Sequence, residues 1–199
     1  NGSLAMYQNP ELIFSRGRNQ GVNSIAEMVK LQMPRTLGNG SNAYGMTIKM
    51  CDAYYMYDGS EFNRQTFLDT CQVGNRFVTK KEGEAGTYPH LKKGVWKEYA
   101  WREPRFYASL SFDRGTWYGD GYTNDEPANL AFYHFRAKEV SGRQTSEDHS
   151  YTGYLNKKVC SYKTGLTKDG FSPYRYSFPI IRLADLYLMY AEALNELNK

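Results

Sequence analysis

The C-terminal segment carries the feature that most constrains the fold, a stripe of apolar residues at helical spacing. Steps of three and four residues place these side chains along one side of a single helix. The stripe consists of Leu183, Leu186, Tyr187, Tyr190, Ala191, Leu194 and Leu197. Polar residues such as Glu192 and Asn195 occupy much of the other side. A helix with so wide a stripe must bury it, so the sequence predicts a partner element.

The sequence stops at Lys199, soon after this stripe, with neither a glycine cap nor a following helix. It opens at Asn1 without an initiator, a signal peptide or a lipobox. We therefore expect the chain to be truncated, with part of the surface that covers the last helix lying in the missing chain.

Composition narrows the class of protein. The 18 Tyr, 10 Phe and 3 Trp residues are far more than disordered chains carry. The net charge of +4 is scattered over isolated pairs such as Lys80 and Lys81, so no clustered basic face indicates nucleic-acid binding. No apolar run approaches the roughly 20 residues that span a bilayer. Cys51, Cys71 and Cys160 match no zinc spacing and leave one disulfide or free thiols open.

Local patterns in the first third predict short elements. Residues 12–14 form an apolar run typical of a strand. Ser24 and Glu27 have capping-box spacing for a helix that Pro34 ends.

A second short helix is predicted from the cap Thr47 through Met56. Residues 63–94 show no clear period, and we expect mostly irregular structure there.

The next segments favour strands and a long loop. Residues 105–112 alternate apolar and polar side chains, which predicts a strand. Residues 113–131 are rich in Gly, Asp and aromatics and predict a loop. Segments near 132–138 and 153–160 look like strands of a small hairpin or sheet.

Residues 179–196 closely resemble the signature of the SusD/RagB family, approximately P-x-x-R-x-A-(E/D)-(V/L)-x-L-x-Y-A-E-A-x-N-E. Residues 47–59 resemble the family's P-T-x-x-x-x-D-A-Y-x-M-x-D-G block, with Met46 in place of its proline. Residues 102–107 resemble its R-D-P-R-F-Y motif, and residues 153–158 are similar to its G-Y-x-x-x-K segment. Four ordered matches over roughly 150 residues make the resemblance specific.

The resemblance implies an α-rich fold with small β elements and long loops. It also implies that the tetratricopeptide-like helical scaffold is largely missing, so that residues 1–199 form a C-terminal domain fragment whose helix over 180–199 packs on that scaffold. The implied protein is a lipid-anchored outer-membrane lipoprotein on the cell surface of a Bacteroidetes-type organism.

The implied role is nutrient uptake in polysaccharide utilization, without catalysis. Such a protein binds oligosaccharides for a SusC-like TonB-dependent transporter. Capture of peptides by a RagB-like member is the alternative, and a glycoside hydrolase is a more distant one.

For ligand contact we favour the loop over residues 113–126, because exposed aromatic rings stack on sugars and polar groups pair with hydroxyls. Its candidate residues are Trp117, Tyr118, Asp120, Tyr122 and Asn124. The alternative is a surface loop pinned by buried aromatics.

Trp96 and Trp101 are second candidates for ligand contact. Their spacing near the predicted strand favours core packing.

Five residues of the family motifs favour structural roles. They are Asp52, Arg102, Arg105, Arg182 and Glu192. We expect Arg182 and Glu192 to make helix-packing ion pairs or hydrogen bonds, and Asp52 and Arg105 to pin loops to the core.

No cofactor is expected, although oxygen-bearing side chains in the loop leave a calcium site open. These side chains belong to Asp120, Asn124, Asp125 and Glu126. Motifs of zinc proteases, serine hydrolases and nucleotide-binding enzymes are absent from the sequence, which favours a binding protein over an enzyme.

Overall fold

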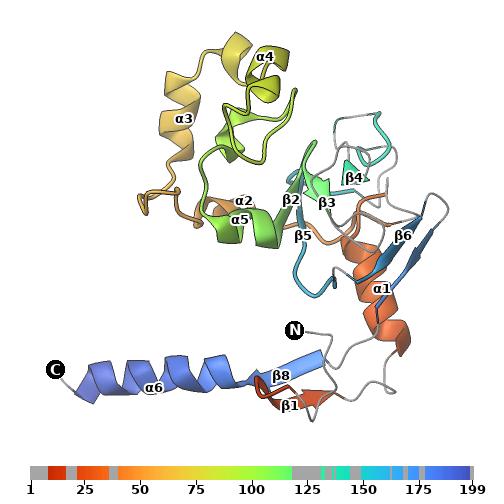
Figure 1. Ribbon diagram of the computed structural model, residues 1–199, viewed down its shortest axis with the longest axis vertical. Coiled ribbons are helices and arrows are strands. Elements are labelled where there is room, and N and C mark those ends of the chain that lie inside the picture. The colour runs from red at the N-terminus through yellow and green to blue at the C-terminus, as the bar shows by residue number, and fades with distance from the viewer. Residues whose placement is uncertain are drawn as a thin grey trace. The chain divides into compact units, whose positions relative to one another are not determined.

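The computed structural model describes most of the chain (Figure 1). The described residues are 9–16, 22–35, 40–117, 131–132, 136, 138–143, 149–161, 163–167, 170–174 and 178–197. The chain divides into two compact units, one formed by residues 1–26 with 174–199 and the other by residues 27–173.

The first unit joins the two ends of the sequence through a β-ladder. β1 (Leu12–Arg16) runs antiparallel to β8 (Phe178–Arg182), and α6 (Leu183–Leu197) follows β8 directly. Glu11 fastens the start of α6, because its main-chain oxygen accepts a hydrogen bond from the Leu183 N–H at 2.8 Å. Its side chain accepts from the next N–H at 3.3 Å. These bonds satisfy donors that have no partner inside the helix.

α6 lies where the sequence predicts the last helix but begins at Leu183 rather than at residue 180. Residues 180–182 belong to β8, where two adjacent isoleucines favour extended backbone. Seven large apolar side chains are exposed along the helix. They are Leu186, Tyr187, Leu188, Met189, Tyr190, Leu194 and Leu197. Packing of α6 on a helical scaffold stays a prediction.

The other elements are short. The remaining helices are α1 (Val22–Gln32), α2 (Ile48–Asp52), α3 (Arg64–Thr70), α4 (Lys80–Glu84) and α5 (Pro104–Ser109), with 3-10 turns η2 (Val73–Asn75) and η3 (Lys97–Tyr99). The remaining strands are β2 (Leu110–Phe112), β3 (Thr116–Trp117), β4 (Ala131–Phe132), β5 (Tyr154–Asn156), β6 (Gly165–Thr167) and β7 (Gly170–Ser172).

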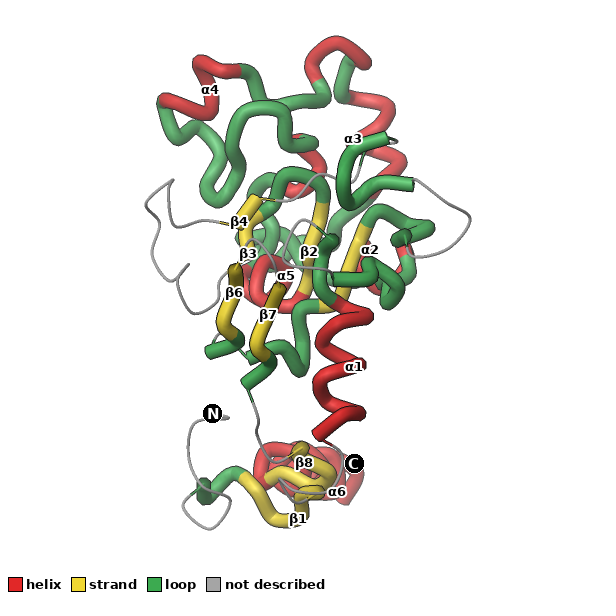
Figure 2. Tube along the Cα trace, turned by 90° about the vertical axis from the view of Figure 1, so that its right-hand side faces the viewer, coloured by secondary structure: helices red, strands yellow, loops and turns green. Residues whose placement is uncertain are grey.

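The strands of the second unit form three antiparallel pairs, β2 with β5, β3 with β4, and β6 with β7. Figure 2 shows β6 and β7 side by side as a short hairpin. No sheet in the described part of the chain has more than two strands. Side-chain packing must therefore supply most of the unit's long-range cohesion.

An aromatic core centred on α5 provides that packing. Phe106 is fully buried, and the rings of Tyr99 and Phe112 stand 4.3 Å apart between centroids. Leu110 and Val95 are also fully buried within this cluster. Large rings removed from water dominate the stability of such a core.

Arg102 is a charged residue buried against the core, with only 2 % of its surface exposed. One of its terminal nitrogens donates to the carbonyl oxygens of Cys51 and Tyr54, at 2.7 and 2.8 Å. Its guanidinium also lies 3.9 Å from the ring centroid of Phe62. These contacts replace the water that a buried cation loses, so Arg102 fastens the end of α2 to the core.

The predicted strand over residues 105–112 is wrong in its first part, which is α5. Pro104 occupies the first turn of this helix, where its missing N–H is harmless. The buried residues of this helix are Phe106 and Ser109, whose separation of three residues is that of one helical face. Only residues 110–112 are extended.

The prediction of mostly irregular structure over residues 63–94 is also wrong in part. Asn63 caps α3 by accepting from the Thr66 N–H at 2.9 Å. Thr79 and Glu82 form a reciprocal capping box at the start of α4. Local caps therefore start helices that the apolar pattern does not reveal.

The other boundaries differ more modestly. Thr47 caps α2 as predicted, but this helix ends at Asp52 instead of Met56. α1 begins at Val22, so Ser24, the predicted cap, lies within the helix instead of before it.

β4 pairs with β3 and β5 pairs with β2, so the described parts of the predicted strands near 132–138 and 153–160 do not pair with each other. Helices still outweigh strands among the described residues, in keeping with the expected α-rich fold with small β elements.

Candidate ligand-binding site

An exposed group of aromatic side chains stands on a short bridge between two loops of the second unit. Met56 and Arg102 face each other across an isolated antiparallel bridge. The Tyr57 N–H donates to the Trp101 carbonyl at 2.7 Å on one side of the bridge. On the other side the Glu103 N–H donates to the carbonyl of Tyr55 at 2.9 Å. The two loops are therefore held in fixed register.

This register brings three aromatic side chains to the surface. Tyr55, Tyr57 and Trp101 are 44 %, 74 % and 48 % exposed, while Arg102 between them turns into the core. Neighbouring residues of an extended segment point to opposite faces, which explains why Tyr55 and Tyr57 are exposed on either side of the less exposed Met56. We call these three residues the aromatic surface.

Trp101 holds a backbone conformation that costs energy. Its φ angle of 56° lies in the left-handed region, where a non-glycine residue pays roughly 1–3 kcal/mol. Such strain persists only when the surroundings fix it and is concentrated at functional sites. Ala100 and Arg102 are buried on either side, so this turn is what carries the indole outward. The prediction that Trp101 packs in the core is wrong for this reason.

Polar groups border the aromatic surface. Glu103 accepts a hydrogen bond from Arg105 at 2.7 Å and another from the Tyr55 N–H at 3.0 Å. These hydrogen bonds hold the pKa of the Glu103 carboxyl below its usual value, and the bond from Arg105 has the larger effect. Asp58 lies next to Tyr57 and binds the hydroxyl of Ser60 at 2.6 Å. Aromatic rings bordered by fixed charges and hydroxyls suit a ligand that has both C–H faces and hydroxyl groups.

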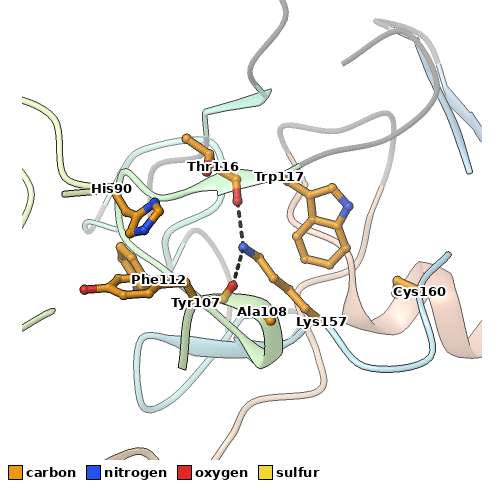
Figure 3. Close-up of a pocket in the computed structure, with 8 residues that line it drawn as sticks. All are labelled: His90, Tyr107, Ala108, Phe112, Thr116, Trp117, Lys157 and Cys160. Carbon is orange, nitrogen blue, oxygen red and sulfur yellow. Dashed lines mark hydrogen bonds between the residues drawn. The ribbon is translucent and has the colours of Figure 1, made fainter. Parts of the chain in front are cut away.

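A cavity of about 380 Å³ lies beside α5 (Figure 3). Its lining combines aromatic rings with one amine, one imidazole and one thiol. The lining residues are His90, Tyr107, Ala108, Phe112, Thr116, Trp117, Lys157 and Cys160. Its size is within the range of small-molecule sites, roughly 300–1,000 Å³.

Lys157 supplies the positive charge of this cavity. Its ammonium donates to the main-chain oxygens of Thr116 and Tyr107, at 2.8 and 3.2 Å. The Trp117 ring centroid is 6.0 Å from the same nitrogen. Burial lowers the pKa of Lys157 to about 8, because the charged form loses hydration. Sequence reasoning missed Lys157, whose only signal was its place in the motif over residues 153–158.

Trp117 is the one favoured loop residue that the structure describes. It is only 4 % exposed and lines the cavity, so it is not an open stacking platform. Tyr118, Asp120, Tyr122 and Asn124 lie outside the described residues, as do Asp125 and Glu126 of the calcium alternative. Ligand binding by that loop stays a prediction. Trp96, the other second candidate, packs partly buried between Phe67 and Phe77.

The motif residues play different structural parts. Asp52 binds Arg64 at 2.6 Å, and Arg102 is buried as described above. Arg105 is exposed and pairs with Glu103. Arg182 pairs with Asp185 at 3.1 Å. Glu192 is exposed and makes no hydrogen bond or ion pair within the described part of the chain.

No metal site is evident where the structure can be described, because no three His, Cys, Asp or Glu residues cluster there. All three cysteines are free thiols. Burial raises the pKa of both Cys51 and Cys160 to about 12, so neither is a ready nucleophile near neutral pH. None of the described helices is both long and apolar enough to cross a membrane.

The chain is similar to known proteins in both structure and sequence. A SusD-like protein from Bacteroides fragilis NCTC 9343 has a similar structure, with a TM-score of 0.61 and 22 % identity. The likeness covers 96 % of this chain and 33 % of that one. The protein BT4246, solved in its selenomethionine form, gives a TM-score of 0.62 at 19 % identity. That likeness covers 92 % of this chain and 30 % of BT4246. No curated protein matches the chain.

The present chain thus spans about a third of the length of these solved structures, which at such identity show a common fold. The sequence profile of the SusD family matches residues 10–199, nearly the whole chain. The chain therefore belongs to the SusD family.

Proposed function

We propose that this chain is part of a lipid-anchored outer-membrane protein that binds oligosaccharides at the cell surface. Its cargo passes to a partner TonB-dependent transporter of the SusC-like kind, and no chemistry is performed on it. SusD-family proteins are nutrient-binding proteins of the cell surface that work with transporters. Family membership supports a role in nutrient binding. The kind of ligand has to be argued from the residues of the site.

The aromatic surface is the observation that carries the proposal. Sugar rings present C–H faces that stack on tyrosine and tryptophan, and their hydroxyl groups pair with flanking carboxylates and guanidinium groups. Tyr55, Tyr57 and Trp101 supply the rings, and Glu103 with Arg105 supplies the polar edge. The bridge between Met56 and Arg102 fixes these loops before a ligand arrives. Preorganisation of this kind reduces the entropy lost on binding.

Tyr55 and Tyr57 occupy positions of the motif over residues 47–59 at which any residue type is allowed. The positions at which the motif requires a particular residue have structural roles. Tyr54 is buried, and Asp52 binds Arg64. The aromatic residues at the variable positions can therefore be replaced, and the bound ligand changed, without altering the residues that hold the fold together.

The first unit has a separate role in this proposal. The exposed apolar side chains of α6 pack on the helical scaffold of the longer protein, which is tetratricopeptide-like. That arrangement fits a chain that spans about a third of its solved relatives.

The test is binding of the full-length protein to a panel of polysaccharides in affinity gels. We expect retardation by at least one glycan and loss of that retardation in Tyr57→Ala/Trp101→Ala. Tyr151→Ala is the matched control, because Tyr151 is 85 % exposed and lies elsewhere in the second unit.

Equal binding by the double variant and the wild type would remove the aromatic surface from the site. Binding of a peptide pool with no glycan binding would replace the proposed ligand class. Analysis of the glycan after long incubation should show no cleavage products.

A further inference from the structure

Lys157 brings a positive charge into the cavity beside α5 that no described carboxylate neutralises. An ammonium group has three donors. Two of them reach the main-chain oxygens of Thr116 and Tyr107, as Figure 3 shows. The third donor has no partner within the described part of the chain.

The two bonds that Lys157 does make leave its charge only partly compensated. Carbonyl oxygens are dipoles, and the Tyr107 carbonyl belongs to the last turn of α5, where the helix dipole favours a cation. This explains why the charge is tolerated. A full negative charge would interact more strongly with it, because a charge-assisted hydrogen bond outweighs one to a neutral carbonyl.

The other lining residues of the cavity indicate which kind of negatively charged ligand would fit. The Trp117 ring lies to one side of the ammonium, and the lining includes Tyr107 and Phe112. His90 packs against Tyr107 with 4.7 Å between ring centroids and holds a left-handed φ of 65°. Aromatic walls around a single cation suit a ring with apolar C–H faces and one acidic substituent. The volume of about 380 Å³ accommodates a group of that size.

We propose that this cavity is an anion-selective subsite in which Lys157 binds the negatively charged substituent of a saccharide, a carboxylate or a sulfate ester. This inference rests on the proposed glycan-binding function and narrows its ligand class to acidic glycans. The aromatic surface stacks on sugar rings, and Lys157 selects for charge.

The first experiment compares the full-length protein on three polysaccharides by isothermal titration calorimetry. Polygalacturonate carries carboxylates, dextran sulfate carries sulfate esters, and dextran is neutral. We expect tighter binding to one of the two acidic polymers than to dextran, and a loss of about tenfold or more in Lys157→Gln, the scale of one charged hydrogen bond.

Lys81→Gln is the matched control, because it removes the same charge from an exposed residue that lines neither the cavity nor the aromatic surface. We expect this variant to bind like the wild type. Equal losses in the two variants would mean that net charge governs binding, and the subsite would be rejected. Unchanged acidic-glycan binding in Lys157→Gln would also reject it.

A second measurement uses only the wild type, so it does not depend on whether a variant folds. Lys157 has a pKa of about 8 in the free protein and binds an anion only when protonated. The apparent dissociation constant for the acidic glycan should rise about tenfold between pH 7 and pH 9, since the competent fraction falls accordingly. A flat profile over this range overturns the proposal.

Different experimental outcomes would refute the anion subsite and the proposed glycan binding. Binding of neutral glycans alone refutes the anion subsite and leaves glycan capture standing. Binding of peptides with no glycan binding refutes both, and a free peptide carboxylate would then be the anion to examine.

Discussion

The guanidinium of Arg64 lies 2.6 Å from the carboxylate of Glu98, a side chain that is only 1 % exposed. The same guanidinium binds Asp52 at 2.6 Å, and the Tyr154 hydroxyl donates to Glu98 at 2.8 Å. These residues come from α2, α3, η3 and β5. The network therefore connects four segments that no ladder joins to one another.

Replacement of Arg64 by methionine should destabilise the protein by about 3–5 kcal/mol, because it leaves the Glu98 carboxylate buried without a countercharge. Urea unfolding measures the loss. Arg105→Met is the matched control, since its ion pair with Glu103 is on the surface and is worth at most about 1 kcal/mol. Arg64→Met/Glu98→Gln should recover part of the loss. Similar losses in Arg64→Met and Arg105→Met would contradict the structural role of the network.

Acid should weaken the start of α4 through Glu82. Its pKa is lowered to about 2, first by a hydrogen bond from Lys97 at 2.8 Å and then by one from the Thr79 N–H. A carboxyl whose pKa is lower in the folded state stabilises above its unfolded value of 4.5, and this stabilisation disappears as the pH falls towards 2.

Unfolding midpoints of the wild type and Glu82→Gln should thus differ at pH 6 and converge near pH 2. Glu84→Gln, which alters an exposed pair with Lys80, should show little difference throughout. A constant gap between wild type and Glu82→Gln at all pH values would disprove the titration.

The left-handed backbone of Trp101 predicts an inverted order of two small substitutions. Trp101→Gly should be more stable than Trp101→Ala by about 1 kcal/mol, because only glycine adopts this φ without steric cost. At ordinary positions alanine is the more stable of the two. Thermal unfolding of both variants decides the matter, and both should lose glycan binding together.

Trp117→Ala should lower stability by about 3–5 kcal/mol, as expected for a large ring removed from a buried site. Trp117→Phe keeps much of the ring and should cost less. Unfolding in guanidinium chloride measures both variants. If Trp117→Ala unfolds like the wild type, the ring is not packed as the structure shows.

Secondary structure was predicted most accurately where a sequence pattern was compatible with only one kind of element. The family motifs, the Thr47 cap and the apolar stripe of α6 each left few alternatives. Residues 105–112 satisfied the two-residue period of a strand, but the burial of Phe106 and Ser109 follows the three-residue step of a helix, and the wrong period was chosen. Tertiary burial, which the pattern does not contain, decided between them.

The site was harder to predict for physical reasons. Exposure of Trp101 depends on one backbone angle and on the burial of its two neighbours. The charge at Lys157 depends on where the chain places two carbonyl groups, from α5 and β3. Neither feature leaves a periodic trace in the sequence. Trp117 was favoured for ligand contact, and its burial instead fits the stated alternative of a surface loop pinned by buried aromatics.

The exposed leucines, tyrosines and methionine of α6 have a consequence for the solution behaviour of this 199-residue chain. Such a surface should bind a fluorescent dye like ANS and promote concentration-dependent light scattering. Tyr187 and Leu188, which are 65 % and 70 % exposed, should also be accessible to a chymotrypsin-type protease. The five consecutive exposed apolar residues over 186–190 thus make this helix a main source of such self-association.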